Sequence, residues 1–305
     1  MSFINGLRRV VAMVIVVFLA AFVTPNKAQP HTVLDEENCK MCITAFSDVH
    51  IEGNRFSTYK GFGRMLQDAG NNTFGNDVGI FLGDSTMNGQ EIESLLFYGL
   101  VKTNSFADEY VNVVGNHDIG NGEGNYDKLA KRFYGFSDEF LGVKTDKPYY
   151  YRVINGVYFI ALGSEKLCVH EYDASDEQLK FLEDCLKKAE ADNAIAFVCC
   201  HHPYFDFSEN TAEYFRNTVS KYKNVFFLSG HTHMPISEWW TFDEDDGITC
   251  INFPKATHNV ENEDYEMCGH GAQIEIYEDE VVVRFRNFYT GEWVEDFTNH
   301  YQLVK

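Results

Sequence analysis

Basic side chains are scarce in this chain. It has 25 Lys and Arg against 46 Asp and Glu, which leaves a formal net charge of −21 over 305 residues. A chain of this charge is repelled by polyanions, so a nucleic-acid backbone or an anionic membrane surface is disfavoured as its main partner. A small phosphate compound is not excluded, because bound metal ions can reverse the field locally.

Long apolar runs are also scarce, since only one is present and it lies at the N-terminus. Arg8 and Arg9 precede the run Val10–Val23, and no later run is long enough to span a membrane. A short apolar run with a basic head is typical of a secretory signal peptide. We therefore expect residues 1–28 to be a signal peptide or, as the alternative, an uncleaved N-terminal membrane anchor. In both cases residues 29–305 would be secreted or otherwise extracytoplasmic, with no other membrane partner.

The chain lacks an internal repeat, a low-complexity linker and a second Cys-x-x-Cys motif. The missing linker favours one domain over residues 29–305. The missing motif disfavours a zinc knuckle built on Cys39 and Cys42. Eight cysteines suit an exported chain, but they allow roughly a hundred pairings. The disulfides expected first join local pairs, namely Cys168 with Cys185 and Cys250 with Cys268.

Apolar runs alternate with helical patterns through the middle of the chain. The runs are near-continuous, which is typical of strands buried on both faces. They are Ile43–Phe46, Val78–Leu82, Tyr110–Val114, Ala194–Cys200 and Val225–Leu228. Helices are expected at Glu91–Lys102, at Ala212–Tyr222, and after a capping box at Ser175. This alternation predicts an α/β fold with mostly parallel strands.

Two hairpins interrupt the alternation. The Asn155-Gly156 turn joins an apolar segment at 149–154 to another at 157–162, and a second hairpin runs from 272 to 288. These antiparallel pairs predict a mixed sheet. The acidic segment 243–247 is expected to be a solvated turn.

Each of the five apolar runs leads into side chains suited to metal binding. The carboxyl ends of parallel strands meet at one edge of a sheet, so we expect these side chains to gather there. They are Asp48, His50, Asp84, Asn116, His117, His201, His231 and His233. Two carboxylates, an amide oxygen and several imidazoles are too many for one tetrahedral ion and suit two ions that share a carboxylate. Gly83, Gly115 and Gly230 would let the backbone turn where a β-carbon would be in the way.

This ordered set of motifs resembles the calcineurin-like metallophosphoesterase superfamily. The motifs are Asp48-x-His50, Gly83-Asp84, Gly115-Asn116-His117-Asp118, His201-x-Pro203 and Gly230-His231-x-His233. All five occur in the family's order and span most of the chain. The resemblance implies a single-domain, four-layer αββα sandwich of two mixed β-sheets flanked by helices, with a dinuclear site at the strand ends.

Carried over residue by residue, the resemblance also implies a role for each side chain. The first ion would be held by Asp48, His50 and His233, the second by Asn116, His201 and His231, with Asp84 bridging the two. His117 would be the catalytic residue and face the phosphoryl group, and Asn116 would also contact the substrate. His202 would lie near the substrate without an assigned task. These ligand types suit divalent or trivalent iron, zinc or manganese alike.

The implied function is hydrolysis of a small phosphate ester. Water bridging two cations would lose a proton and attack phosphorus in line, and protonated His117 would stabilise the transition state or protonate the departing alkoxide. The stretch Ser85-Thr-Met-Asn after Asp84 has neither the Val-Asp-Arg-Gly continuation of protein Ser/Thr phosphatases nor the tyrosine of purple acid phosphatases. His50 stands where purple acid phosphatases carry glycine. The pattern is closest to bacterial-type phosphodiesterases of the cyclic-nucleotide and glycerophosphodiester group. A phosphomonoesterase of the same fold and a secreted non-catalytic metal-binding protein are the alternatives, and the sequence does not indicate the oligomeric state.

Overall fold

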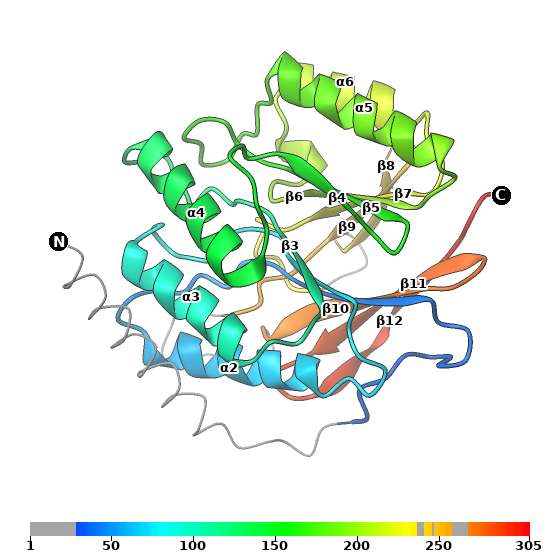
Figure 1. Cartoon of the computed structure of the whole chain (residues 1–305), viewed down its shortest axis with the longest axis horizontal. Helices are drawn as coiled ribbons and strands as arrows, with labels where there is room; N and C mark the ends of the chain where they lie inside the picture. Colours follow the sequence, from blue (N-terminus) through cyan, green and yellow to red (C-terminus); the bar gives the residue numbers. More distant parts are fainter. Residues whose placement is uncertain (1–28, 237–240, 246, 258–267) are drawn as a thin grey trace.

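Two stacked β-sheets form the centre of the molecule, with helices on both outer sides (Figure 1). The computed structural model describes residues 29–236, 241–245, 247–257 and 268–305. The expected signal peptide or anchor at residues 1–28 lies outside the described residues. No helix in the part that is described has the length and apolar character needed to cross a membrane.

The first sheet has six strands in the order β12-β11-β10-β1-β2-β3. Strands β1, β2 and β3 run parallel, and β10, β11 and β12 pair antiparallel beside β1. Their bounds are Met41–Phe46 (β1), Val78–Phe81 (β2), Glu109–Asn112 (β3), His270–Ile276 (β10), Glu280–Asn287 (β11) and Glu292–Gln302 (β12). The hairpin expected over 272–288 is therefore present as β10 and β11.

The second sheet has six strands in the order β4-β5-β6-β7-β9-β8. Strands β5, β6, β7 and β9 are parallel, while β4 and β8 are antiparallel edge strands. Their bounds are Tyr150–Ile154 (β4), Val157–Leu162 (β5), Ala196–Cys200 (β6), Val225–Ser229 (β7), Phe242–Asp245 (β8) and Ile248–Asn252 (β9). The turn at Asn155 and Gly156 has positive φ angles of 49° and 81°, as an Asn-Gly hairpin requires. A simple solvated turn was expected at 243–247. The structure corrects this, because Phe242–Asp245 forms strand β8.

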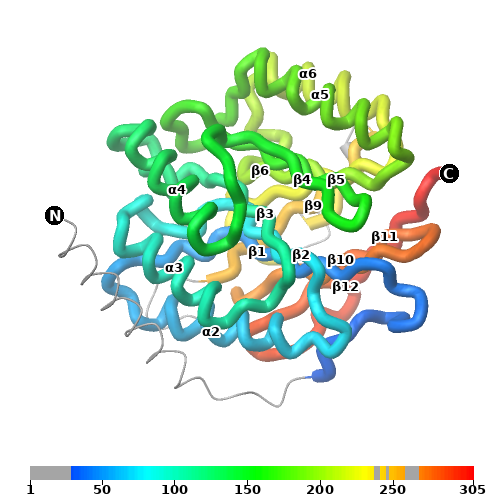
Figure 2. The backbone as a smooth tube through the Cα atoms, viewed as in Figure 1, coloured from blue at the N-terminus to red at the C-terminus, as the bar shows by residue number. Residues whose placement is uncertain are grey.

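Five α-helices cover the outer faces in the described part of the chain. They are α2 (Phe56–Gly70), α3 (Glu91–Thr103), α4 (Tyr126–Leu141), α5 (Asp176–Ala191) and α6 (Glu209–Val219). Helices α2 and α3 lie on one side of the molecule, and α5 and α6 lie on the opposite side (Figure 2). One apolar cluster lies under α2, α3 and α4, a second fills the space between the sheets, and a third lies under α5 and α6. These three layers of packing confirm the αββα sandwich.

The helices differ in how well the sequence predicts them. Helix α5 begins where expected, since the Ser175 hydroxyl accepts a hydrogen bond from the Gln178 amide. Helix α6 begins earlier than expected because Ser208 caps it. Helices α2 and α4 were not predicted. Glycines interrupt both patterns, at Gly61 and Gly63 in α2 and at Gly135 in α4, and burial of one face against the first sheet outweighs their low helix propensity.

The expected disulfides are not formed. Neither Cys168–Cys185 nor Cys250–Cys268 is bridged among the described residues. Cys185 packs into the apolar cluster under α5, whereas the Cys168 sulfur lies 3.0 Å from the Ser164 hydroxyl. These pairs were expected because their cysteines are close in the sequence. In the fold, Cys168 and Cys185 contact different neighbours.

A buried ion pair joins α2 to the first sheet. Arg286 on β11 donates two hydrogen bonds to the Asp68 carboxylate, at 2.7 and 3.0 Å, and both side chains are buried. His31 completes this contact through the Asp68 carbonyl and the Gln273 side chain, each at 2.8 Å. Burial lowers the pKa of His31, so it is neutral at pH 7. This network anchors residues 29–32 against the sheet.

We expect Asp68→Ala to lower the free energy of unfolding by about 3–5 kcal/mol, because Arg286 would remain charged and buried without its partner. Urea denaturation followed by circular dichroism measures this change. Asp184→Ala is the matched control, since Asp184 is also a helical aspartate paired with a basic side chain, but both members of its pair are exposed. Equal effects of the two substitutions would contradict the stabilising role of the buried pair.

Candidate metal centre

The ends of five parallel strands from two different sheets meet at one place. Strands β1, β2 and β3 belong to the first sheet, and β6 and β7 belong to the second. The sequence predicted a site on one sheet edge, and the structure corrects this to the shared rim of two stacked sheets. The loops that leave these strands carry all the predicted side chains to this rim, namely Asp48, His50, Asp84, Asn116, His117, His201, His231 and His233.

The two aspartates each use one oxygen for hydrogen bonding. Asp48 Oδ2 accepts from the Ser47 hydroxyl at 2.6 Å and from the His231 amide at 3.0 Å, and Asp84 Oδ1 accepts from the His117 amide at 2.8 Å. The other oxygens, Asp48 Oδ1 and Asp84 Oδ2, are buried and receive no well-aligned hydrogen bond from the described residues. Buried carboxylate oxygens without a partner are costly, and bound cations would satisfy both of them.

One group of donor atoms surrounds Asp48 Oδ1. His233 Nε2 lies 3.0 Å from this oxygen and His50 Nε2 lies 3.4 Å from it. The two imidazole nitrogens are 2.9 Å apart, close enough to share one ion. His50 Nε2 also lies 3.5 Å from Asp84 Oδ2. Asp48, His50, Asp84 and His233 thus offer four donor atoms within 4.8 Å of one another.

A second group shares Asp84 with the first. His201 Nε2 lies 3.1 Å from Asp84 Oδ2, and His231 Nδ1 lies 3.3 Å from His201 Nε2. The Asn116 side chain donates from Nδ2 to Asn121 Oδ1 at 2.9 Å, which leaves its buried Oδ1 without a hydrogen bond. Two groups of oxygen and imidazole donors that share one carboxylate are what two adjacent cations require.

Protonation states in the centre also suit cation binding. Burial would raise the pKa values of Asp48 and Asp84, but the imidazoles around them, His201 foremost, keep both pKa values below the ordinary range. Burial lowers the pKa of His50 and of His231 to about 4, so both are neutral at pH 7. Burial also lowers the pKa of His201, but Asp84 and Asp48 outweigh it and raise the value to about 9. A cation held by His201 must therefore displace a proton, which weakens binding as the pH falls.

The backbone around the centre is tightly folded. A β-carbon on Gly115 would lie 2.1 Å from Asp84 Oδ1, and one on Gly230 would lie 1.8 Å from the Ser47 hydroxyl oxygen. Five of the candidate ligands themselves adopt the left-handed region, with φ between 49° and 71°, namely Asp48, His50, Asp84, His231 and His233. Such conformations are unfavourable for residues with side chains, and they cluster where function requires them.

Asp118 links two of the loops that carry the ligands. Its carboxylate accepts hydrogen bonds from the Gly115 amide at 3.0 Å, the Thr86 amide at 2.9 Å and the Thr86 hydroxyl at 2.8 Å. Burial and the nearby charge of Asp84 raise its pKa to about 6. Asp118 thereby fixes the loop after β3 against the loop after β2.

The comparison with protein families agrees with this geometry. The model of the calcineurin-like phosphoesterase family matches residues 41–235. The chain belongs to this family. The match confirms the resemblance seen in the motifs and makes the chain a metal-dependent phosphoester hydrolase.

Solved structures share the fold of this phosphoesterase at low sequence identity. A dimetal phosphatase from Danio rerio superposes with a TM-score of 0.58 and 14% identity, over 88% of this chain and 100% of that chain. A purple acid phosphatase from yellow lupin (Lupinus luteus) seeds superposes with a TM-score of 0.57 and 16% identity, over 85% of this chain and 53% of that chain. The phosphoesterase thus spans about half the length of the lupin protein. No curated protein matches the chain.

An open cavity of about 460 Å³ lies over the candidate ligands of the phosphoesterase. Its wall includes His117 and Asn121, together with residues that no motif had indicated: Val169, His170, Asp206, Thr232 and Met234. His202 is not on this wall. It is buried behind His231, with ring centroids 4.5 Å apart, and it stacks on Tyr172. The expected contact between His202 and substrate is therefore not supported, because its ring is packed away from the cavity.

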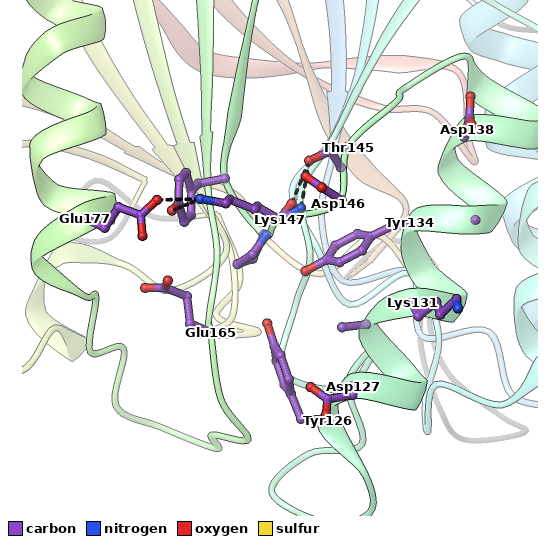
Figure 3. Close-up of a pocket in the computed structure, with 14 residues that line it drawn as sticks. Tyr126, Asp127, Lys131, Tyr134, Asp138, Thr145, Asp146, Lys147, Glu165 and Glu177 are labelled. Atoms are coloured by element: carbon purple, nitrogen blue, oxygen red, sulfur yellow. Dashed lines mark hydrogen bonds and ion pairs between the residues drawn. The ribbon is translucent and has the colours of Figure 1, made fainter.

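A second cavity, of about 630 Å³, lies apart from the metal centre (Figure 3). Its wall comes from α4, the segment before β4 and the start of α5. The phenol groups of Tyr126 and Tyr134 point toward each other across one side, and Lys147 reaches Glu177 on the other (Figure 3). None of its described wall residues is a candidate metal ligand, so the larger cavity is not the catalytic one.

We expect Asp84→Ala to abolish binding of both metal ions, because Asp84 Oδ2 is the oxygen common to the two groups. Elemental analysis of the purified protein measures this loss. Asp206→Ala is the control, because Asp206 lines the same cavity but belongs to neither group. Retention of two ions per chain in the Asp84 variant would show that the two groups do not share this carboxylate.

Proposed function

We propose that this chain is an exported dinuclear-metal phosphodiesterase that hydrolyses a small phosphate diester. The observation that carries the proposal is the pair of donor groups sharing Asp84 beneath an open cavity. Asp48, His50 and His233 would hold the first ion, and Asn116, His201 and His231 the second. Iron, zinc and manganese all suit these ligands. Export rests on the basic and apolar pattern of residues 1–28.

The charge of the cavity wall favours a diester over a monoester. A phosphate monoester carries up to two negative charges at pH 7, and enzymes commonly bind such groups with Arg or Lys in addition to metal ions. None of the described residues that line this cavity is Arg or Lys. Asp206 adds a negative charge to the wall. A diester carries a single negative charge and needs less positive charge from the protein, so it fits this wall better.

The metal centre and His117 would together support hydrolysis. Two cations bound in the centre would polarise the phosphoryl group and lower the pKa of coordinated water. His117 lies at the cavity wall, and its Nδ1 donates to the Met87 carbonyl at 2.7 Å. This contact fixes the ring and leaves Nε2 to face the substrate, where it can give a proton to the departing alkoxide. The His117 amide holds Asp84 in place at the same time.

We expect the manganese-loaded protein to hydrolyse bis-p-nitrophenyl phosphate with a higher kcat/KM than p-nitrophenyl phosphate, and a chelator to abolish both activities. Release of p-nitrophenolate measures each rate. Faster turnover of the monoester would favour a phosphomonoesterase. No turnover of either ester with manganese, zinc or iron would favour a non-catalytic metal-binding protein.

We expect His117→Ala to retain both metal ions while kcat falls by about 10²–10⁴-fold for esters with poor leaving groups. The decrease should be smaller for p-nitrophenyl esters, because p-nitrophenolate departs without needing a proton. Comparing kcat for a series of aryl leaving groups of increasing pKa measures this dependence. Loss of the metal ions in this variant, shown by elemental analysis, would place His117 among the ligands instead.

A further inference from the structure

Two kinds of side chain line the cavity over the metal centre. One kind comprises candidate ligands together with His117. The other kind is apolar, and two of its members, Phe205 and Met234, are 58% and 39% exposed. Val169 and the ring of His170 also line the cavity. Large apolar side chains exposed inside a ligand cavity indicate that part of the ligand covers them.

Phe205 and Met234 both lie next to metal-binding motifs in the chain. Phe205 lies in the short 3₁₀ helix Tyr204–Asp206, which directly follows the His201-x-Pro203 motif. The neighbouring Tyr204 ring packs on Phe207 and Phe215, with centroids 5.9 and 5.8 Å apart. Met234 directly follows His233. Both apolar side chains therefore belong to loops that also carry candidate metal ligands.

We propose that Phe205 and Met234 select phosphodiesters in which the esterified group that stays on phosphorus is an uncharged aromatic ring. This inference rests on the proposed phosphodiesterase function and assigns a substrate class to it. A flat ring can stack on Phe205 and contact the Met234 thioether, as aromatic rings and sulfur do favourably elsewhere. An anionic group there would be repelled by Asp206, whose carboxylate lies 3.9 Å from His231 Nε2.

Two synthetic diesters with the same leaving group test the selection, namely p-nitrophenyl phenyl phosphate and p-nitrophenyl ethyl phosphate. We expect Phe205→Ala to lower the phenyl-to-ethyl ratio of kcat/KM about tenfold relative to the wild type, and Met234→Ala to lower it by a smaller factor. The intrinsic reactivities of the two esters cancel in this comparison, because the same pair is used with each protein. Phe205→Leu, which keeps apolar volume but removes the ring, should also lower the ratio.

Phe56→Ala is the matched control. Phe56 is 60% exposed, much like Phe205, but it does not line the cavity, so its removal should leave the ratio unchanged. The inference would be overturned if Phe205→Ala left the phenyl-to-ethyl ratio of kcat/KM unchanged, even if kcat/KM fell equally for both esters. That result would leave the proposed function intact. Failure of the wild type to hydrolyse either diester would contradict the proposed function itself, and the inference with it.

Discussion

A buried carboxylate shared between two groups of imidazoles is the constraint on which the rest of this phosphoesterase depends. Asp84 is fully buried, and an uncompensated charge in such surroundings would be costly. His50 and His201 lie within 3.5 and 3.1 Å of its free oxygen, one from each group. The geometry therefore suits a pair of cations, because two bound ions would compensate both carboxylates and use the imidazole nitrogens around them as ligands.

Local features that look unfavourable in isolation follow from this constraint. Candidate ligands adopt left-handed backbone conformations, and Gly115 and Gly230 lie where no β-carbon would fit. The buried carboxylate of Asp118 links two loops through hydrogen bonds. Each of these features costs stability. The two packed sheets and the apolar clusters on either side of them provide the rigid frame that offsets such costs.

Much of the fold was predictable because strands buried on both faces need near-continuous apolar runs. The five runs that lead to the centre all form strands, and the Asn155-Gly156 hairpin forms where its turn residues require it. Helices α2 and α4 were not predicted because interior glycines interrupt their periodicity, and packing against the first sheet stabilises both. The local disulfide pairs were wrong, because closeness along the chain does not bring side chains together across layers.

The sequence by itself determined which side chains could bind metal ions, because ligand type and strand-end position are both properties of local sequence. Only the tertiary structure decided how these side chains divide between two stacked sheets. It also decided that His202 is buried behind His231 while Phe205, His170 and Met234 face the cavity. The physical reason is that a side chain's exposure depends on neighbours brought in from distant segments, and no local pattern records them.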